Sequence, residues 1–277
     1  MSLRVGLIQT RTPATQAAAL THVAPLIRNA AAQGATLIVT PEGSNILQKD
    51  RAKLLPLLAR PADDPVVTGL QAMAAKLKVW ILIGSALVLR DDGKAANRAM
   101  LVSPDGEIVA TYDKLHMFDV DLPTGETARE SEVYEPGDRA VTALAGEARL
   151  GLTICYDMRF PAVYRALALA GAEILTVPAA FTRPTGKAHW EILLRARAIE
   201  TGSFVLAPAQ GGFHEDGRGT WGHTLALGPW GEILGQLDHD EPGVLVVDLP
   251  LAAIAAARGA IPALANARAF APPEPLA

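Results

Sequence analysis

Residues 152–161 read Leu-Thr-Ile-Cys-Tyr-Asp-Met-Arg-Phe-Pro and contain the only cysteine of the 277-residue chain, Cys155. The apolar, β-prone residues before the cysteine predict a buried strand, and the polar residues after it predict a turn at the carboxyl end of that strand. Open α/β sheets place ligands and reactive groups at this end of their strands. Because a single cysteine cannot form an internal disulfide, Cys155 is either a buried packing residue or a nucleophile.

Predicted strands and helices alternate on both sides of this stretch. The strands are predicted at 3–10, 35–40, 79–89, 149–155, 172–177 and 204–208, and the helices at 15–33, 65–77, 161–170 and 188–201. Strands that alternate with helices are typical of an α/β fold. The sequence therefore predicts that class.

Two predicted hairpins resemble each other. Residues 99–112 turn at Pro104-Asp105-Gly106, and residues 224–236 turn at Gly228-Pro229-Trp230-Gly231. Both turns have the residue types that tight turns need, and in both the last glycine is followed by Glu-Ile. This echo predicts two similar halves, arranged as a four-layer α-β-β-α sandwich of two mixed sheets with the helices outside.

No linker separates two domains, so residues 1–250 are predicted to form one domain. Residues 251–277 are rich in alanine and proline and are predicted to form a C-terminal tail. Such a tail is either a loose end or an arm that lies on a second subunit. We favour the arm.

The net charge is −4, and no run rich in lysine and arginine occurs. This composition argues against nucleic acid and anionic membranes as partners. The longest apolar stretch, residues 79–89, is too short to cross a bilayer. The amino terminus shows no signal-peptide core, and the single cysteine suits a reducing compartment, so we expect a cytoplasmic protein.

Three charged residues stand where they could activate the thiol. Glu42 follows a predicted buried strand, and partial burial is expected to raise its pKa toward the range of a general base. Lys114 ends the first hairpin, where it either extends along the surface or serves as a fixed cation. Glu130 lies in a predicted loop, and its ordinary role would be that of a solvated acid. A free thiol is little ionised at neutral pH, so Cys155 would need such a base or cation.

The combination of these motifs resembles the nitrilase superfamily of carbon–nitrogen hydrolases, in particular its Nit branch. The matching features are Pro41-Glu42-Gly43, Lys114 after the hairpin, the stretch 155–161 and the segment 188–200. The resemblance extends from about residue 4 to residue 247.

The resemblance implies a covalent mechanism in which a thiol attacks an amide or nitrile carbon. It assigns the nucleophile to Cys155 and the general base to Glu42. It assigns the oxyanion hole to Lys114 and the backbone N–H of Tyr156, and a place beside the lysine and the substrate to Glu130. We expect neither a metal nor another cofactor, because there is no second cysteine for a thiolate zinc site and His189 and Glu191 have poor spacing for metal ligands on a helix.

The predicted substrate is a small-molecule amide that carries a carboxylate. The guanidinium of Arg159 suits a carboxylate, although it could instead pair with a local acid. By resemblance, Phe181 and Thr185 line the pocket. The closest resemblance is to amidases that cleave deaminated glutathione into 2-oxoglutarate and cysteinylglycine. The alternative is an omega-amidase acting on 2-oxoglutaramate or 2-oxosuccinamate. In either case we expect a homodimer or a larger homo-oligomer.

Two further interpretations compete with this one. Cys155 could form a cysteine–histidine pair with His116 or His189. The chain could also be an inactive binding module in which Cys155 is only packed. The glycines of 217–222 fit a dinucleotide motif by letter, but they precede a strand rather than a helix, so that motif is rejected.

Overall fold

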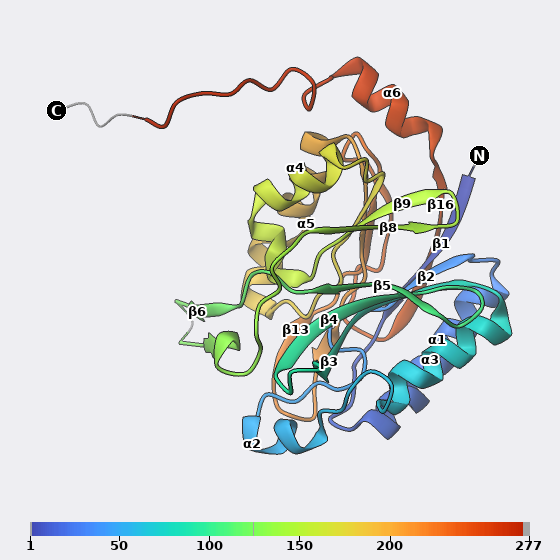
Figure 1. Ribbon diagram of the computed structural model, residues 1–277, viewed down its shortest axis with the longest axis vertical. Helices are drawn as coiled ribbons and strands as arrows, with labels where there is room; N and C mark the ends of the chain where they lie inside the picture. The colour runs from blue at the N-terminus through green and yellow to red at the C-terminus, as the bar shows by residue number, and fades with distance from the viewer. Residues whose placement is uncertain (1, 124, 274–277) are drawn as a thin grey trace.

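Two six-stranded mixed sheets form the centre of the molecule, a computed structural model that describes residues 2–123 and 125–273 (Figure 1). The first sheet consists of β1 (Ser2–Gln9), β2 (Leu37–Val39), β3 (Trp80–Leu89), β4 (Ala95–Val102), β5 (Ile108–Asp113) and β16 (Gly243–Pro250). Its strand order is β16-β1-β2-β3-β4-β5.

The second sheet has the order β15-β14-β11-β10-β9-β8. Its strands are β8 (Val141–Ala145), β9 (Ala148–Leu152), β10 (Ile174–Thr176), β11 (Phe204–Ala207), β14 (Leu225–Leu227) and β15 (Ile233–Gln236). Cys155 lies three residues beyond the end of β9.

The two sheets repeat one pairing pattern. From β16 to β5, successive strand pairs are antiparallel, parallel, parallel, antiparallel and antiparallel. From β8 to β15 the same five relations occur in the same order. The two hairpins whose turns echo each other, β4-β5 and β14-β15, occupy equivalent places. The predicted sandwich of two similar halves is therefore confirmed.

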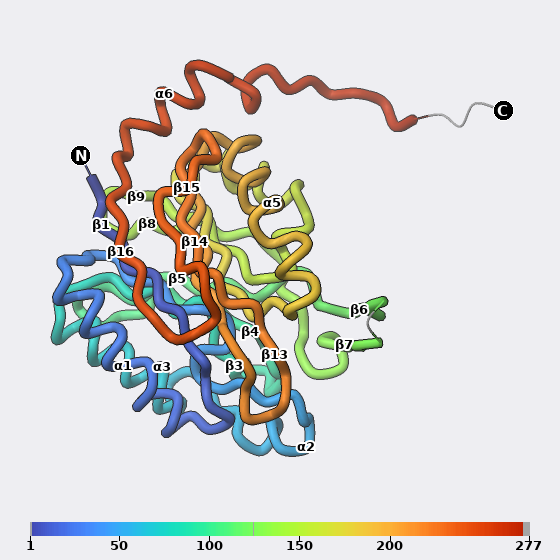
Figure 2. Tube along the Cα trace, turned by 180° about the vertical axis from the view of Figure 1, so that it is seen from behind, coloured from blue at the N-terminus to red at the C-terminus, as the bar shows by residue number. Residues whose placement is uncertain are grey.

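Helices cover the outer face of each sheet (Figures 1 and 2). Helices α1 (Gln16–Ala32) and α3 (Pro65–Leu77) pack on the first sheet, and α4 (Pro161–Leu169) and α5 (Arg183–Thr201) pack on the second. The shorter elements are α2 (Arg51–Leu54), β6 (Asp119–Asp121), β7 (Thr127–Arg129), β12 (Gly211–Phe213), β13 (Gly219–Trp221), α6 (Ala252–Ala260) and the 3-10 helices η1 (Leu55–Leu57), η2 (Glu130–Glu132) and η3 (Cys155–Arg159).

Alternating side chains explain why the sheets need covers on both faces. On β2, Leu37 and Val39 join the core between the sheets, whereas Ile38 joins the core beneath α1 and α3. Successive strand residues point to opposite faces, so a strand that is apolar throughout must be buried on both. These buried faces hold the strand ends, and therefore the residues that follow them, in fixed positions.

A close approach at Gly84 brings the first sheet near Cys155. A Cβ atom at this position would lie 1.8 Å from the carbonyl oxygen of Thr40 and 2.4 Å from Cβ of Pro178. Only glycine therefore allows the end of β2, the strand β3 and Pro178 to meet here. Pro178 in turn accepts a hydrogen bond from the backbone N–H of Cys155 at 2.9 Å.

The structure departs from the predicted elements at several places, and it contains two sheet strands, β8 and β16, that the sequence analysis did not predict. Helix α5 begins at Arg183 rather than at residue 188, because Pro184 is tolerated in the first turn of a helix. The predicted loop after residue 119 contains the hairpin β6-β7 and the 3-10 helix η2. The predicted tail begins with a helix, α6, that the sequence analysis did not predict.

Helix α6 is attached to the second half of the sandwich. Ile254 is buried, and the Arg258 guanidinium donates to the carbonyl oxygens of Thr201 (3.1 Å) and Ala172 (2.7 Å). Beyond α6 the chain extends away from the sheets (Figures 1 and 2). The last four residues of the predicted tail lie outside the described residues, and the domain boundary at residue 250 stays a prediction. No helix within residues 2–123 and 125–273 is long and apolar enough to cross a membrane.

Candidate active site

Cys155 has a backbone conformation that is unusual for a residue with a side chain. Its φ angle is +49°, in the left-handed region, and it opens the 3-10 helix η3 directly after β9. Conformations of this kind cost on the order of 1–3 kcal/mol and cluster at functional sites. Cys155 is 8% exposed. The strain indicates a side chain that is held in place for a purpose other than packing.

A buried carboxylate, Asp157, fixes the turn that carries the thiol. It accepts hydrogen bonds from the backbone N–H of Ile154 (2.9 Å) and of His116 (3.1 Å). It also accepts one from the hydroxyl of Tyr112 at 2.6 Å and contacts Nδ1 of His116 at 2.7 Å. The sequence analysis missed Asp157 as a site residue, although it stands two positions after the cysteine.

Three of the predicted charged residues meet in one buried cluster. Nζ of Lys114, which is 2% exposed, lies 3.0 Å from Oε1 of Glu42. The same ammonium lies 2.9 and 2.7 Å from the two carboxylate oxygens of Glu130. Glu42 follows β2, Lys114 follows β5 and Glu130 opens η2, so three separate elements converge here.

Hydrogen bonds from the second sheet also fix Glu42. The backbone N–H of Ala180 donates to its Oε2 at 2.8 Å, and Nε2 of Gln210 donates to its backbone carbonyl at 2.8 Å. Gln210 is fully buried, and its Oε1 accepts from the Thr10 hydroxyl at 2.9 Å. Gln210 thus ties the two sheets together at Glu42. The sequence analysis did not identify this residue.

The pKa of Glu42 corrects an expectation from the sequence. Burial on its own would raise the pKa, as predicted. The charge of Lys114 and hydrogen bonds from Cys155, Lys114 and Asn97 outweigh burial and hold the pKa of Glu42 below its usual value. Glu42 is therefore ionised at neutral pH.

The neighbours of Glu42 have the complementary proton arrangement. Burial and the charge of Glu42 raise the pKa of the Cys155 thiol well above its ordinary value, against the opposing effect of Lys114. Burial would lower the pKa of Lys114, but the carboxylates of Glu130 and Glu42 raise it well above its ordinary value. The resting cluster therefore contains a neutral thiol, a charged ammonium and an ionised Glu42.

The backbone N–H of Tyr156 stands at the start of η3. Among the hydrogen bonds of the described residues, none uses this N–H as a donor. The first amides of a helical turn have no partner within the turn and can bind an anion. This N–H is therefore available to an oxygen that develops negative charge on a substrate.

Two of the predicted pocket residues lie together beside the Tyr156 ring. The guanidinium carbon of Arg159 lies 5.8 Å from the centre of the Tyr156 ring and 5.4 Å from that of Phe181. Arg159 donates to Nδ1 of His189 at 3.2 Å, and within the described residues it forms no ion pair with an acid. The hydroxyl of Thr185 instead contacts the hydroxyl of Thr182 at 2.8 Å. Because Arg159 has no acid partner among the described residues, its guanidinium is free to receive a carboxylate.

Neither histidine of the competing interpretation bonds to the thiol in the structure. His116 is held by Asp157 and stacks on Phe160 with 3.5 Å between ring centres. His189 bonds to Arg159. The groups that shift the pKa of Cys155 are carboxylate, ammonium and backbone groups, and neither histidine is among them. This geometry favours a Glu–Lys–Cys arrangement over a cysteine–histidine pair.

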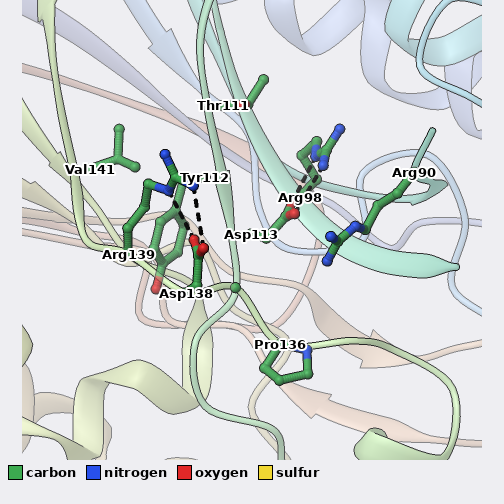
Figure 3. Close-up of a pocket in the computed structure, with 10 residues that line it drawn as sticks. Arg90, Arg98, Thr111, Tyr112, Asp113, Pro136, Asp138, Arg139 and Val141 are labelled. Atoms are coloured by element: carbon green, nitrogen blue, oxygen red, sulfur yellow. Dashed lines mark hydrogen bonds and ion pairs between the residues drawn. The ribbon is translucent and has the colours of Figure 1, made fainter. Parts of the chain in front are cut away.

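A separate cavity of about 400 Å³ lies at the end of β5 (Figure 3). Four of its charged groups form two pairs, because Arg98 binds Asp113 at 2.6 and 2.9 Å and Arg139 binds Asp138 at 2.9 Å. None of the predicted site residues lines it. Within the described residues, no group of His, Cys, Asp and Glu side chains is arranged to hold a metal ion.

The fold of this chain is that of a carbon–nitrogen hydrolase. Residues 4–259 match the family described as carbon-nitrogen hydrolase, so the chain belongs to that family, as the sequence analysis predicted. Among curated proteins it is 41% identical to the deaminated glutathione amidase of Yersinia enterocolitica over 238 residues, 85% of this chain and 82% of that protein. It is 34% identical to the omega-amidase NIT2 of Homo sapiens over 96% of this chain and 95% of that protein.

A solved structure supports the fold assignment. The crystal structure of Saccharomyces cerevisiae Nit3, a member of branch 10 of the nitrilase superfamily, superimposes with a TM-score of 0.84 at 25% identity. The superposition covers 94% of each chain. The two mixed sheets of this chain are therefore those of the nitrilase superfamily.

Proposed function

We propose that this hydrolase cleaves a small carboxylated amide, deaminated glutathione, through a thioester on Cys155. One observation carries the proposal: the only thiol of the chain is strained and buried, and its pKa is raised by burial and by the charge of an ionised Glu42 that is itself paired with Lys114. Such a group has a nucleophile, a base and a cation within one hydrogen-bonded cluster.

The first step forms a bond between Sγ of Cys155 and the carbonyl carbon of the amide, while the thiol proton moves to Glu42. The carbonyl oxygen becomes an oxyanion that the Tyr156 N–H can bind. At rest the three N–H groups of Lys114 face three carboxylate oxygens within 3.0 Å. Once Glu42 takes the proton it loses its charge, so Lys114 can turn its charge toward the oxyanion.

The second step releases the amine and then the acid. Glu42 gives its proton to the leaving nitrogen as the carbon–nitrogen bond breaks, which leaves a thioester on Cys155. Glu42 next takes a proton from water, and the resulting hydroxide attacks the thioester carbon. The thiol regains the proton as the carboxylic acid product leaves. Glu130 is proposed to hold Lys114 in place through both steps.

The substrate class follows from Arg159 and from the relatives. The Arg159 guanidinium has no acid partner among the described residues and lies beside the Phe181 ring. It is proposed to bind the carboxylate at the keto-acid end of the substrate, with Thr185 near the pocket wall. The deaminated glutathione amidase relative supports cysteinylglycine as the leaving group. The omega-amidase relative supports ammonia as the alternative leaving group. Both substrates would leave the same 2-oxoglutaryl group on Cys155.

A comparison of the two amides tests the proposed substrate. We expect wild-type protein to release 2-oxoglutarate from deaminated glutathione with a higher kcat/KM than from 2-oxoglutaramate. Arg159→Gln should raise KM for both about tenfold or more, because a charged hydrogen bond to the carboxylate is lost. A preference for 2-oxoglutaramate would assign the omega-amidase activity instead. Release from neither amide would reject both substrates.

We further propose a homodimer or larger assembly that works in the cytoplasm. Helix α5 exposes Ile192 and Ile199, which lie seven residues apart and so share a face. The turn at Gly231, next to the exposed Trp230, packs against Ile199. Exposed apolar patches of this kind mark protein interfaces. A reducing compartment would keep the Cys155 thiol in the form that the mechanism needs.

A further inference from the structure

Asn97 donates hydrogen bonds to both carboxylates of the cluster. It lies on β4 and is 2% exposed. Its Nδ2 donates to Oε1 of Glu42 at 2.9 Å and to Oε1 of Glu130 at 3.1 Å. One amide nitrogen therefore donates its two hydrogens to two different carboxylates, which come from two different parts of the chain.

Asn97 and Lys114 share the same two acceptor atoms. Nζ of Lys114 lies 3.0 Å from Oε1 of Glu42 and 2.9 Å from Oε1 of Glu130. Two nitrogen donors thus bridge the same two carboxylate oxygens. The amide adds no charge, so the cluster keeps two carboxylates against one ammonium. A second cation in place of Asn97 would hold the acids as well but would weaken Glu42 as a base.

The other end of the Asn97 amide has no partner. Oδ1 is buried, and no hydrogen bond to it exists within the described residues. A buried polar atom without a partner destabilises the fold, and an apolar side chain of the same size would avoid that cost. The sheet alone therefore does not explain an asparagine here. The two N–H bonds to Glu42 and Glu130 do.

We propose that Asn97 is a positioning residue that fixes the distance between Glu42 and Glu130 and holds the Glu42 carboxylate in its orientation beside the thiol. This inference rests on the proposed roles of Glu42 and Cys155. It differs from them in that Asn97 acts through the carboxylates and touches neither the substrate nor the thiol.

The charged surroundings of Glu42 define what the loss of Asn97 would do. The titratable groups that face Glu42 are Lys114 from the end of β5, Cys155 from η3 and Glu130 from η2. The charges of Glu130, Glu42 and Lys114 also affect the pKa of the Tyr134 hydroxyl. The hydrogen bond from Asn97 is one of the causes that keep the pKa of Glu42 low. Without it the pKa of Glu42 rises, and the base ionises only at higher pH.

Asn97→Leu and Asn97→Ser test the proposal, since leucine offers no donor and serine offers one. Asn45→Ser is the matched control, because Asn45 is also fully buried and bonds to the backbone of Leu87, the residue that pairs with Asn97 across the sheet. The readouts are the pH dependence of kcat/KM and, without any substrate, the pH dependence of Cys155 alkylation by iodoacetamide.

We expect Asn97→Leu to move the acid limb of both profiles upward by about one pH unit and to lower kcat about tenfold, because a hydrogen bond to the ionised carboxylate is lost. Asn97→Ser should lie between Asn97→Leu and wild type. Asn45→Ser should melt earlier but keep the wild-type pH profile. KM should change less than kcat in both Asn97 variants.

Three results would overturn the proposal: an unmoved acid limb in folded Asn97→Leu, the same unmoved limb in Asn97→Ser should the leucine variant not fold, or an equal shift in Asn45→Ser. The alkylation profile separates this inference from the proposed function. If wild type hydrolyses neither amide but the alkylation limb shifts in Asn97→Leu, the substrate assignment fails and the positioning role stands.

Discussion

At the scale of single residues, the resting site keeps a proton on Cys155 and a negative charge on Glu42. The raised pKa of the thiol and the lowered pKa of Glu42 mean that the thiolate is not preformed. The proton must therefore move as the carbon–sulfur bond forms, when Lys114 and the Tyr156 N–H stabilise the new charge on the substrate oxygen. This order leaves no thiolate at rest that an oxidant could attack.

The pH profile of the reaction follows from these pKa directions. Because the pKa of Glu42 is depressed, the base is active above that pKa, and kcat/KM should fall only as the pH drops below the ordinary value of 4.5. The raised pKa of Cys155 gives no basic limb below its ordinary value of 9.0. Initial rates measured between pH 4 and pH 9 check this pH profile. Glu42→Gln should lower kcat about 10²–10⁴-fold, because the general base is lost. An acid limb between pH 6 and 7 would contradict it.

The sequence predicted which charged residues gather here but not their proton states. Glu42, Lys114, Glu130 and Cys155 were found because their motifs resemble a family. The direction of the Glu42 pKa depends on donors from distant parts of the chain, such as Asn97 and Ala180, which no local pattern reveals. A polar residue inside the apolar run of β4 was the one available signal for Asn97.

At the scale of secondary-structure elements, Asp157 holds the turn that carries the thiol. Its carboxylate accepts hydrogen bonds from Ile154 just before η3, from Tyr112 of β5 and from His116 after β5, so it joins the nucleophile to the end of the hairpin that holds Lys114. The left-handed conformation of Cys155 persists because these bonds and the bond to Pro178 hold both sides of it.

Asp157→Asn should therefore loosen the nucleophile as well as the fold. We expect a loss of about 2–3 kcal/mol in the free energy of unfolding, because buried N–H and O–H donors lose an acceptor. Urea denaturation and the rate of Cys155 alkylation measure the two effects. Asp138→Asn is the control, because Asp138 pairs with the adjacent, exposed Arg139, and this substitution should leave the free energy of unfolding nearly unchanged. Equal stability of the two variants would show that Asp157 does not anchor the turn.

Most strands of the two sheets were predicted because apolar runs bounded by turn residues specify them, but β8 and β16 were missed. The early start of α5 and the hairpin β6-β7 were not predictable, since both lie in polar sequence, where tertiary contacts determine the secondary structure. Helix α6 was missed for a similar reason: its alanine-rich sequence has one buried anchor, Ile254, and depends on Arg258 reaching Thr201 and Ala172.

At the scale of the whole molecule, one half-sandwich is repeated, and each half supplies one of the two reacting groups, from strands that are not equivalent in the repeat. Glu42 follows β2 of the first sheet, and Cys155 follows β9 of the second. Residues from the ends of both sheets, including Gln210 and Ala180, close the site between them. Any change that shifts one sheet against the other should therefore affect the base and the nucleophile together.

The exposed face of α5 gives a prediction at the same scale. Ile192 is 70% exposed and Ile199 57% exposed, and together with Trp230 they form the proposed subunit interface. Ile192→Glu combined with Ile199→Glu should turn the oligomer into a monomer, because charges would be buried without partners. Light scattering after size-exclusion chromatography measures this. Leu144→Glu, an exposed apolar site on β8, is the control. A wild-type monomer would reject the interface.

The most direct test of the account is whether Cys155 carries the acyl group during turnover. Wild type and Cys155→Ala would be mixed with deaminated glutathione, quenched in acid during turnover and analysed by intact-protein mass spectrometry, with released 2-oxoglutarate measured in the same samples. We predict a 2-oxoglutaryl adduct and product from wild type, and neither from Cys155→Ala. Release of 2-oxoglutarate by folded Cys155→Ala at a rate near that of wild type would contradict the central claim.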